Sequence, residues 1–172
     1  MKIDQFQKEA KRTCAELGEK LNLCHMVFGM HTELDEYLKA VAKGDKINEI
    51  EEISDGCWFL ANYCTFRGYN LNSLWKHSIS TEKGLIHNLH TLDDMIKKYI
   101  AYDYPIPFDK EKEILYGICY NYQRMFNGVD VEHALENNIN KLRVRFPDKF
   151  DSEKALNRDL ESERKELSKG LE

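Results

Sequence analysis

Hydrophobic residues recur along most of this chain at intervals of three and four positions, which is the spacing of one face of an α-helix. Runs of this kind cover residues 4–21, 25–43, 48–64, 71–76, 81–102, 109–126 and 131–146. No segment keeps up the alternation of polar and apolar residues that a half-buried strand requires. The pattern therefore predicts an all-α fold, a helical bundle with additional helices, in which residues 1–172 form a single domain.

Short turn signals separate these predicted helices. Gly44 suits the left-handed conformation that closes a helix, and Asp45 can cap the helix that follows. Because the loop between them is so short, we expect the helices over residues 25–43 and 48–64 to be antiparallel neighbours. The prolines of residues 104–107 end a later helix without separating domains, since helical spacing resumes directly after them.

Two further segments are expected to lie outside this helical hairpin. Residues 70–128 are interpreted as an inserted helical segment. Within it, His87 and His90 lie three residues apart and Asp94 follows four residues later, a spacing that we interpret as a polar flank and not as a set of metal ligands. Residues 151–171 are predicted to form one highly charged terminal helix across the outside of the bundle.

The charge balance argues against a general nucleic-acid or membrane binder. The chain has 25 lysines and arginines against 30 acidic residues, a formal net charge of −5, and no basic stripe that could neutralise many phosphates. No apolar run approaches the roughly 18 residues of a membrane helix, and the N-terminus does not resemble a signal peptide. A cytoplasmic protein is expected. The five cysteines include no CxxC pair, which favours buried, reduced thiols over zinc ligands or disulfides.

Two pairs of carboxylates lie three residues apart, each on the edge of an apolar helical stripe. Glu33 and Glu36 form the first pair, and Glu52 and Asp55 form the second. Like charges at such neighbouring positions repel one another, so a partner that neutralises them is expected. If the two helices pack antiparallel, the four carboxylates can meet in one place, where they would suit Mg²⁺, or alternatively Mn²⁺. The alternative interpretation is an acidic helix edge that simply faces water.

Helical geometry assigns different directions to the residues around these pairs. Asp35 and Glu51 are expected to point away from the cluster, because each is turned by about 100° from a neighbouring ligand. Glu49 lies one turn before Glu52 on a similar face and is a candidate base or outer partner. Leu38 is expected to continue the buried apolar stripe of its helix.

A line of polar residues follows one face of the helix over residues 131–146. Asn138, Lys141 and Arg145 fall at positions i, i+3 and i+7. Facing the carboxylate cluster, they would present an amide, an ammonium and a guanidinium group to the oxygens of a triphosphate. A solvated helix face is the alternative explanation for this line.

The acidic motifs, in their order and context, resemble a known family. Glu33-x-x-Glu36, a spacer and then Glu52-x-x-Asp55 in the context Glu-Glu-Ile-Ser-Asp-Gly-Cys-Trp are similar to the MazG-type all-α nucleoside triphosphate pyrophosphohydrolases. Residues 138–147 and 157–160 resemble the C-terminal part of short, often phage-type, members of that group. The resemblance covers about residues 25–65 and 130–165.

This resemblance implies hydrolysis of nucleoside or deoxynucleoside triphosphates to the monophosphate and pyrophosphate. It also implies a homodimer or homotetramer. The four carboxylates would be the metal ligands and catalytic residues, and the side chains of Asn138, Lys141 and Arg145 would bind the phosphates. A non-enzymatic or catalytically inactive helical interaction protein of the same fold is the main alternative. A di-iron carboxylate bundle is less favoured, because no Glu-x-x-His motif accompanies the acidic pairs.

Overall fold

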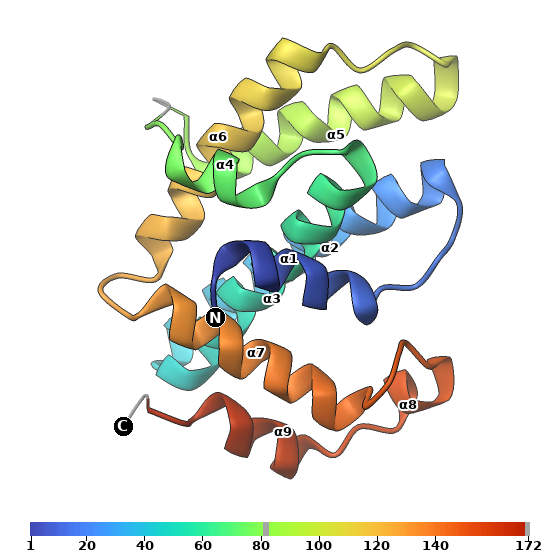
Figure 1. The fold of residues 1–172 in the computed structure, drawn as a ribbon. Helices are drawn as coiled ribbons and strands as arrows, with labels where there is room; N and C mark the ends of the chain where they lie inside the picture. Colours follow the sequence, from blue (N-terminus) through green and yellow to red (C-terminus); the bar gives the residue numbers. More distant parts are fainter. Residues whose placement is uncertain (81–82, 171–172) are drawn as a thin grey trace.

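The computed structural model describes residues 1–80 and 83–170, and every regular element in these ranges is an α-helix (Figure 1). The prediction of an all-α fold is confirmed. No helix in this part of the chain is long and apolar enough to cross a membrane. The helices are α1 (Ile3–Arg12), α2 (Glu19–Lys43), α3 (Lys46–Arg67), α4 (Leu71–Lys76), α5 (Leu85–Tyr102), α6 (Phe108–Met125), α7 (Val131–Arg145), α8 (Ser152–Leu156) and α9 (Leu160–Leu167).

The antiparallel hairpin of α2 and α3 is confirmed, together with the residues that were predicted to close it. Gly44 adopts the left-handed conformation at φ 68°, and the Asp45 carboxylate accepts a hydrogen bond of 3.2 Å from the backbone N–H of Asn48. The two helices approach closely one turn before the first acidic motif, where a Cβ atom on Gly29 would overlap the ring of Phe59. This contact holds the acidic edge of α2 against α3.

The other helices pack around this hairpin. The α5 helix packs against α2, whereas α1, α6 and α7 pack against α3, and α9 covers α7. Figure 1 shows the α5–α6 pair on one side of the hairpin and the segment from α7 to α9 on the opposite side. Residues 70–128 are therefore attached to both helices of the hairpin, through α5 on α2 and through α6 on α3.

A fully buried carboxylate joins α6 to the end of α3. Glu111 accepts hydrogen bonds from the hydroxyls of Tyr63 (2.5 Å) and Tyr69 (2.8 Å), and Arg67 binds its two oxygens at 2.8 and 2.9 Å. The guanidinium group supplies the counter-charge that a carboxylate away from water requires. Glu111 is thus a structural carboxylate that lies outside both acidic motifs.

The predicted helix over residues 4–21 is wrong in its second half. The α1 helix ends at Arg12, and α2 begins at Glu19, after Gly18 at φ 88°. The intervening turn is stabilised by Asn22, whose side-chain oxygen accepts a hydrogen bond of 2.9 Å from the backbone N–H of Leu17. A glycine with positive φ and a side-chain acceptor just beyond it are sufficient to interrupt the helix.

The predicted terminal helix over residues 151–171 is interrupted in the same way. It consists of α8 and α9, and Asp159 caps the second of them by accepting a hydrogen bond of 3.1 Å from the backbone N–H of Ser162. The end of this prediction at residue 171 lies outside the described residues. The first two positions of the predicted helix over residues 81–102 also lie outside the described residues. The helix that corresponds to this prediction is α5, which begins at Leu85.

The apolar stripe of α2 also ends earlier than predicted. Leu38 is 51% exposed, although its position was expected to be buried. Ala40 faces the interior in this turn and is 1% exposed.

Candidate functional site

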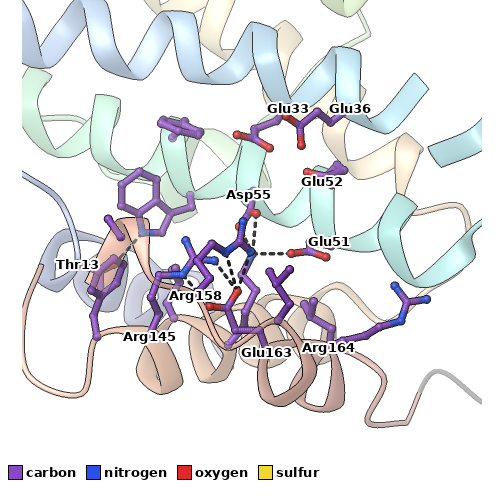
Figure 2. Close-up of a pocket in the computed structure, with 18 of the residues that line it drawn as sticks. Thr13, Glu33, Glu36, Glu51, Glu52, Asp55, Arg145, Arg158, Glu163 and Arg164 are labelled. Atoms are coloured by element: carbon purple, nitrogen blue, oxygen red, sulfur yellow. Dashed lines mark hydrogen bonds and ion pairs between the residues drawn. The ribbon is translucent and has the colours of Figure 1, made fainter. Parts of the chain in front are cut away.

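A cleft of about 620 Å³ lies between the α2–α3 hairpin and the segment from α7 to α9 (Figure 2). Its size is in the range of sites that hold small organic ligands. Three kinds of side chain share its walls: carboxylates from α2 and α3, cationic groups from α7 to α9, and aromatic rings from α3 and the region after α7. Each of the two acidic motifs contributes to this cleft.

Glu33, Glu36 and Glu52 form a compact group of carboxylates. Each offers one oxygen, and these oxygens all lie within 4.8 Å of one another. Figure 2 shows the three side chains converging on one place from α2 and α3. Two oxygens bound to the same Mg²⁺ lie no more than about 4.2 Å apart, since each bond is about 2.1 Å long. Only a small adjustment would therefore let the three carboxylates share a cation.

Burial and mutual repulsion favour the protonated forms of Glu33 and Glu52 in the absence of a cation. The pKa of Glu33 is raised mainly by burial, and then by the charge of Asp55 and by a hydrogen bond with Glu52. Burial also raises the pKa of Glu52, although the hydrogen bond with Glu33 works in the opposite direction. Glu33 therefore keeps a proton that it shares with Glu52 through their hydrogen bond, and a divalent cation would displace this proton.

A buried hydroxyl without a partner among the described residues lies near the same group. The side chain of Tyr122, from α6, is 2% exposed, and its hydroxyl oxygen makes no hydrogen bond to this part of the chain. This oxygen would lie 2.6 Å from a Cβ atom on Gly56, the residue that follows Asp55. Burial raises the pKa of Tyr122, with further contributions from Cys57 and Glu33. This hydroxyl is an unpaired donor close enough to Glu33 to be affected by its charge, although Tyr122 does not line the cleft.

Asp55 lies in the same cleft but faces α7 instead of the other three carboxylates. Its oxygens accept hydrogen bonds from Lys141 Nζ at 2.8 and 2.6 Å and from the side-chain amide of Asn138 at 2.6 Å. Two of the three side chains predicted to bind phosphate thus hold Asp55. The negative charge of Asp55, the fourth predicted metal ligand, is therefore neutralised by the ammonium group of Lys141.

The expectation that Glu51 points away from the site is wrong. Its carboxylate lines the cleft and accepts a hydrogen bond of 3.1 Å from Lys141 Nζ, so Glu51 and Asp55 share one lysine. Lys141 is 1% exposed. Burial alone would lower the pKa of its ammonium group, but the charges of Asp55 and Glu51 outweigh this and raise the pKa. Lys141 therefore stays protonated inside the protein.

Arg145, the third residue of the predicted phosphate line, pairs with a carboxylate that sequence reasoning missed. Its guanidinium group binds Glu163 of α9 at 2.9 and 2.6 Å, and Arg158 binds the same carboxylate at 3.2 and 2.7 Å. Burial would raise the pKa of Glu163, yet the hydrogen bonds from the two arginines hold it below its usual value. Two guanidinium groups and one carboxylate leave a net positive charge on this wall of the cleft.

Aromatic side chains form another part of the wall. Trp58 and Phe59 contact each other edge to face with ring centroids 4.9 Å apart, and the ring of His25 lies 5.6 Å from that of Phe59. The indole N–H of Trp58 donates a hydrogen bond of 3.0 Å to the Thr13 hydroxyl. In Figure 2, Thr13 is well separated from the three converging glutamates. The aromatic and acidic parts are thus spaced along one cleft.

Two acidic neighbours of the motifs take no part in these walls. Glu49, a candidate base by its helical position, pairs with Lys46 at 2.8 Å and is absent from the cleft lining. Asp35 pairs with Lys39 on the exposed side of α2, as its predicted direction requires. Asp35 therefore provides a matched control for the glutamate that follows it.

Comparisons with known proteins do not identify the chain. No family model matches it, and no curated protein or solved structure matches it either. The resemblance to MazG-type enzymes therefore depends on the motif residues alone, and the function has to be argued from the chemistry of the cleft.

Proposed function

We propose that this protein is a Mg²⁺-dependent hydrolase that cleaves nucleoside or deoxynucleoside triphosphates into the monophosphate and pyrophosphate. The observation that carries the proposal is the presence, in one cleft, of a carboxylate group suited to a hard cation, a cationic wall and an aromatic wall. These are the three kinds of surface that a metal-bound triphosphate with a planar base requires. The motif resemblance agrees with this assignment.

In the proposed mechanism, Glu33, Glu36 and Glu52 would hold the Mg²⁺, with Mn²⁺ as a substitute. When bound, the cation supplies charge neutralisation for the phosphates and a lower pKa for a water molecule. One of these carboxylates would accept the proton of a water that attacks a phosphorus of the α–β bridge, and the bridging P–O bond would break to leave the monophosphate and pyrophosphate. Lys141 and Asn138 fix the position of Asp55 at the edge of this site through their hydrogen bonds.

The cationic wall orients the phosphate chain. Arg145 and Arg158 are held by Glu163 and present the planar, bidentate donors that suit phosphate oxygens. Phosphate oxygens that enter the cleft compete with Glu163 for these donors. We therefore assign phosphate binding to the two arginines, and we assign Asn138 and Lys141 to the positioning of Asp55.

The aromatic wall receives the base. Trp58, Phe59 and His25 can stack against any base, because stacking depends on the π face and not on a particular pattern of hydrogen bonds. We therefore expect modest discrimination among bases. The sugar is placed between the aromatic wall and the phosphate-binding arginines.

We also propose that the protein assembles as a homodimer or homotetramer. Large apolar side chains of α2 are exposed, among them Leu21 at 62% and Phe28 at 63%. Such side chains are often covered in subunit interfaces. Light scattering coupled to size exclusion should give a mass of two or four chains, and replacement of Phe28 by Ser should shift that mass towards the monomer. A wild-type mass of one chain would contradict this part of the proposal.

The proposed activity is tested by incubating the chain with Mg²⁺ and a panel of the common ribo- and deoxynucleoside triphosphates, followed by separation of the products. Monophosphate and pyrophosphate should appear in equal amounts. Diphosphate and inorganic phosphate would place the cleavage at another bond and would contradict the proposal. Absence of turnover across the panel, combined with retained binding of triphosphates, would favour the alternative of a catalytically inactive protein with the same fold.

A further inference from the structure

A second group of potential metal ligands lies on the opposite side of α2. His31 on α2 and His90 and Asp93 on α5 each offer one donor atom, and these atoms all lie within 4.8 Å of one another. His31 Nε2 lies 2.8 Å from Asp93 Oδ2, and the rings of His31 and His90 stack with centroids 5.5 Å apart. Two helices that pack against each other thus bring two imidazoles and one carboxylate to a single point.

This group contains an oxygen without a partner among the described residues. Asp93 Oδ1 is buried and accepts no hydrogen bond from this part of the chain, although Asp93 Oδ2 faces His31. A carboxylate oxygen that has lost its water and gained no donor is costly to leave unpaired. His90 is exposed, so the group as a whole remains open to solvent and to an entering ion. The Asp93 side chain as a whole is 32% exposed, and this one oxygen is both buried and unpaired among the described residues.

The donor set differs in kind from the group of glutamates. Two imidazole nitrogens and one carboxylate oxygen match the ligands of Zn²⁺ and related borderline ions, whereas Mg²⁺ prefers oxygen donors throughout. Water would complete the coordination, since three protein ligands leave at least one position open. We propose that His31, His90 and Asp93 form a binding site for a divalent transition-metal ion of the Zn²⁺ class.

The two groups are separated by the body of α2. His31 precedes Glu33 by two residues, which corresponds to a rotation of about 200° around the helix axis. Glu33 faces α3 and the cleft, and His31 faces α5. An ion at the second site would therefore link α5 to the helix that carries Glu33 and Glu36, without entering the cleft. The proposal does not depend on the proposed hydrolase activity.

His90 belongs to this proposed site, although its spacing from His87 was interpreted as that of a polar flank. His90 joins His31 and Asp93, whereas Asp94 pairs with Lys97 and Lys98 at 2.6 and 2.5 Å. His87, three residues before His90, is exposed and lies outside the group. His87 is therefore a matched control for His90 on the same helix.

The test is a Zn²⁺ titration of the reduced chain of residues 1–172 against a chromophoric chelator, in the presence of excess Mg²⁺ to occupy the glutamates. The wild-type protein should bind one equivalent of Zn²⁺. His90→Ala should weaken this binding by about tenfold or more, as expected for loss of a ligand, and His87→Ala should leave it unchanged. Zn²⁺ should also raise the melting temperature of the wild type and of His87→Ala, but not that of His90→Ala.

Three results would overturn the proposal. They are absence of Zn²⁺ binding by the wild type, equal losses in the two histidine variants, and Zn²⁺ binding that survives in His90→Ala but is lost in Glu36→Gln. Cobalt substitution provides a further check on thiol ligands. An intense thiolate charge-transfer band would assign the ion to cysteine and would also refute the site.

Discussion

Glu33→Gln should make the protein less sensitive to alkaline pH, and the size of this effect follows from the shared proton. A carboxyl group whose pKa is higher in the folded chain than in the unfolded chain stabilises the fold below its unfolded pKa. That contribution is lost as the pH rises through the folded pKa. The pKa of Glu33 is raised by burial, by the charge of Asp55 and by the contact with Glu52, so the folded protein keeps a proton that the unfolded chain releases.

The magnitude can be worked out from this one proton. While the folded chain holds one proton more than the unfolded chain, the free energy of unfolding falls by about 1.4 kcal/mol for each pH unit. Between pH 6 and pH 8, an unfolded glutamate is already ionised, so the loss amounts to about 2.7 kcal/mol. The amide that Glu33→Gln introduces carries no titrating proton and can still donate a hydrogen bond to Glu52, so this contribution should disappear.

The assay is urea unfolding followed by circular dichroism at pH 6, 7 and 8, with EDTA present to remove divalent cations. The stability of Glu33→Gln relative to the wild type should increase steadily with pH. Titrating groups far from Glu33 are the same in both proteins, so the difference isolates the hydrogen-bonded pair of Glu33 and Glu52. Saturating Mg²⁺ should flatten the wild-type dependence, because the cation replaces the proton. A constant difference between the two proteins from pH 6 to pH 8 would refute the shared proton.

Three further substitutions test other parts of the structure. Lys141→Ala should lower the free energy of unfolding by about 3–5 kcal/mol, because it leaves the carboxylates of Glu51 and Asp55 without a counter-charge. A loss below about 1 kcal/mol in urea unfolding would contradict this expectation. Glu111→Ala should cost a similar amount, because Arg67 and two tyrosines lose their acceptor, and conservative Glu111→Gln should restore part of it. Glu163→Gln should tighten triphosphate binding several-fold in a fluorescence titration, because a competing charge is removed from the two arginines that are proposed to bind phosphate. Weaker binding would show that Glu163 orders these arginines instead.

The sequence was most informative where local signals decide the structure. Gly44 and Asp45 close the hairpin through their own backbone preference and side-chain cap, and both act over only a few residues. The interruptions at Gly18 and Asp159 were missed although they depend on the same kind of signal. Apolar residues such as Leu17 continue the helical spacing through the first break, so periodicity alone concealed it.

The candidate site was predictable only in part, because one helix can have two buried faces. Glu33, Glu36 and Glu52 meet as the helical geometry of the hairpin indicates. Glu51 was assigned to the wrong side because α3 packs against α7 as well as α2, and a single interior direction cannot describe such a helix. The long side chain of Lys141 then reaches Glu51 across this second face.

The partners on the cationic wall could not have been found from spacing at all. Arg145 and Glu163 are separated by 18 residues and a break between two short helices, so no helical or turn rule relates them. The same holds for Tyr122, which the apolar pattern places in the core but whose hydroxyl direction depends on how α6 lies against Gly56. These contacts arise from the tertiary arrangement.

The central claim is that a defined group of carboxylates binds the catalytic cation. It is tested most directly by the initial rate of pyrophosphate release from a nucleoside triphosphate at saturating Mg²⁺. Glu36 lies at the exposed edge of the group and Asp35 lies next to it on the outer side of α2, so Glu36→Gln and Asp35→Asn remove the same charge from adjacent positions. The wild type and Asp35→Asn should release pyrophosphate at similar rates, and Glu36→Gln should be slower by about 100-fold or more. Equal rates for the two variants would contradict the claim.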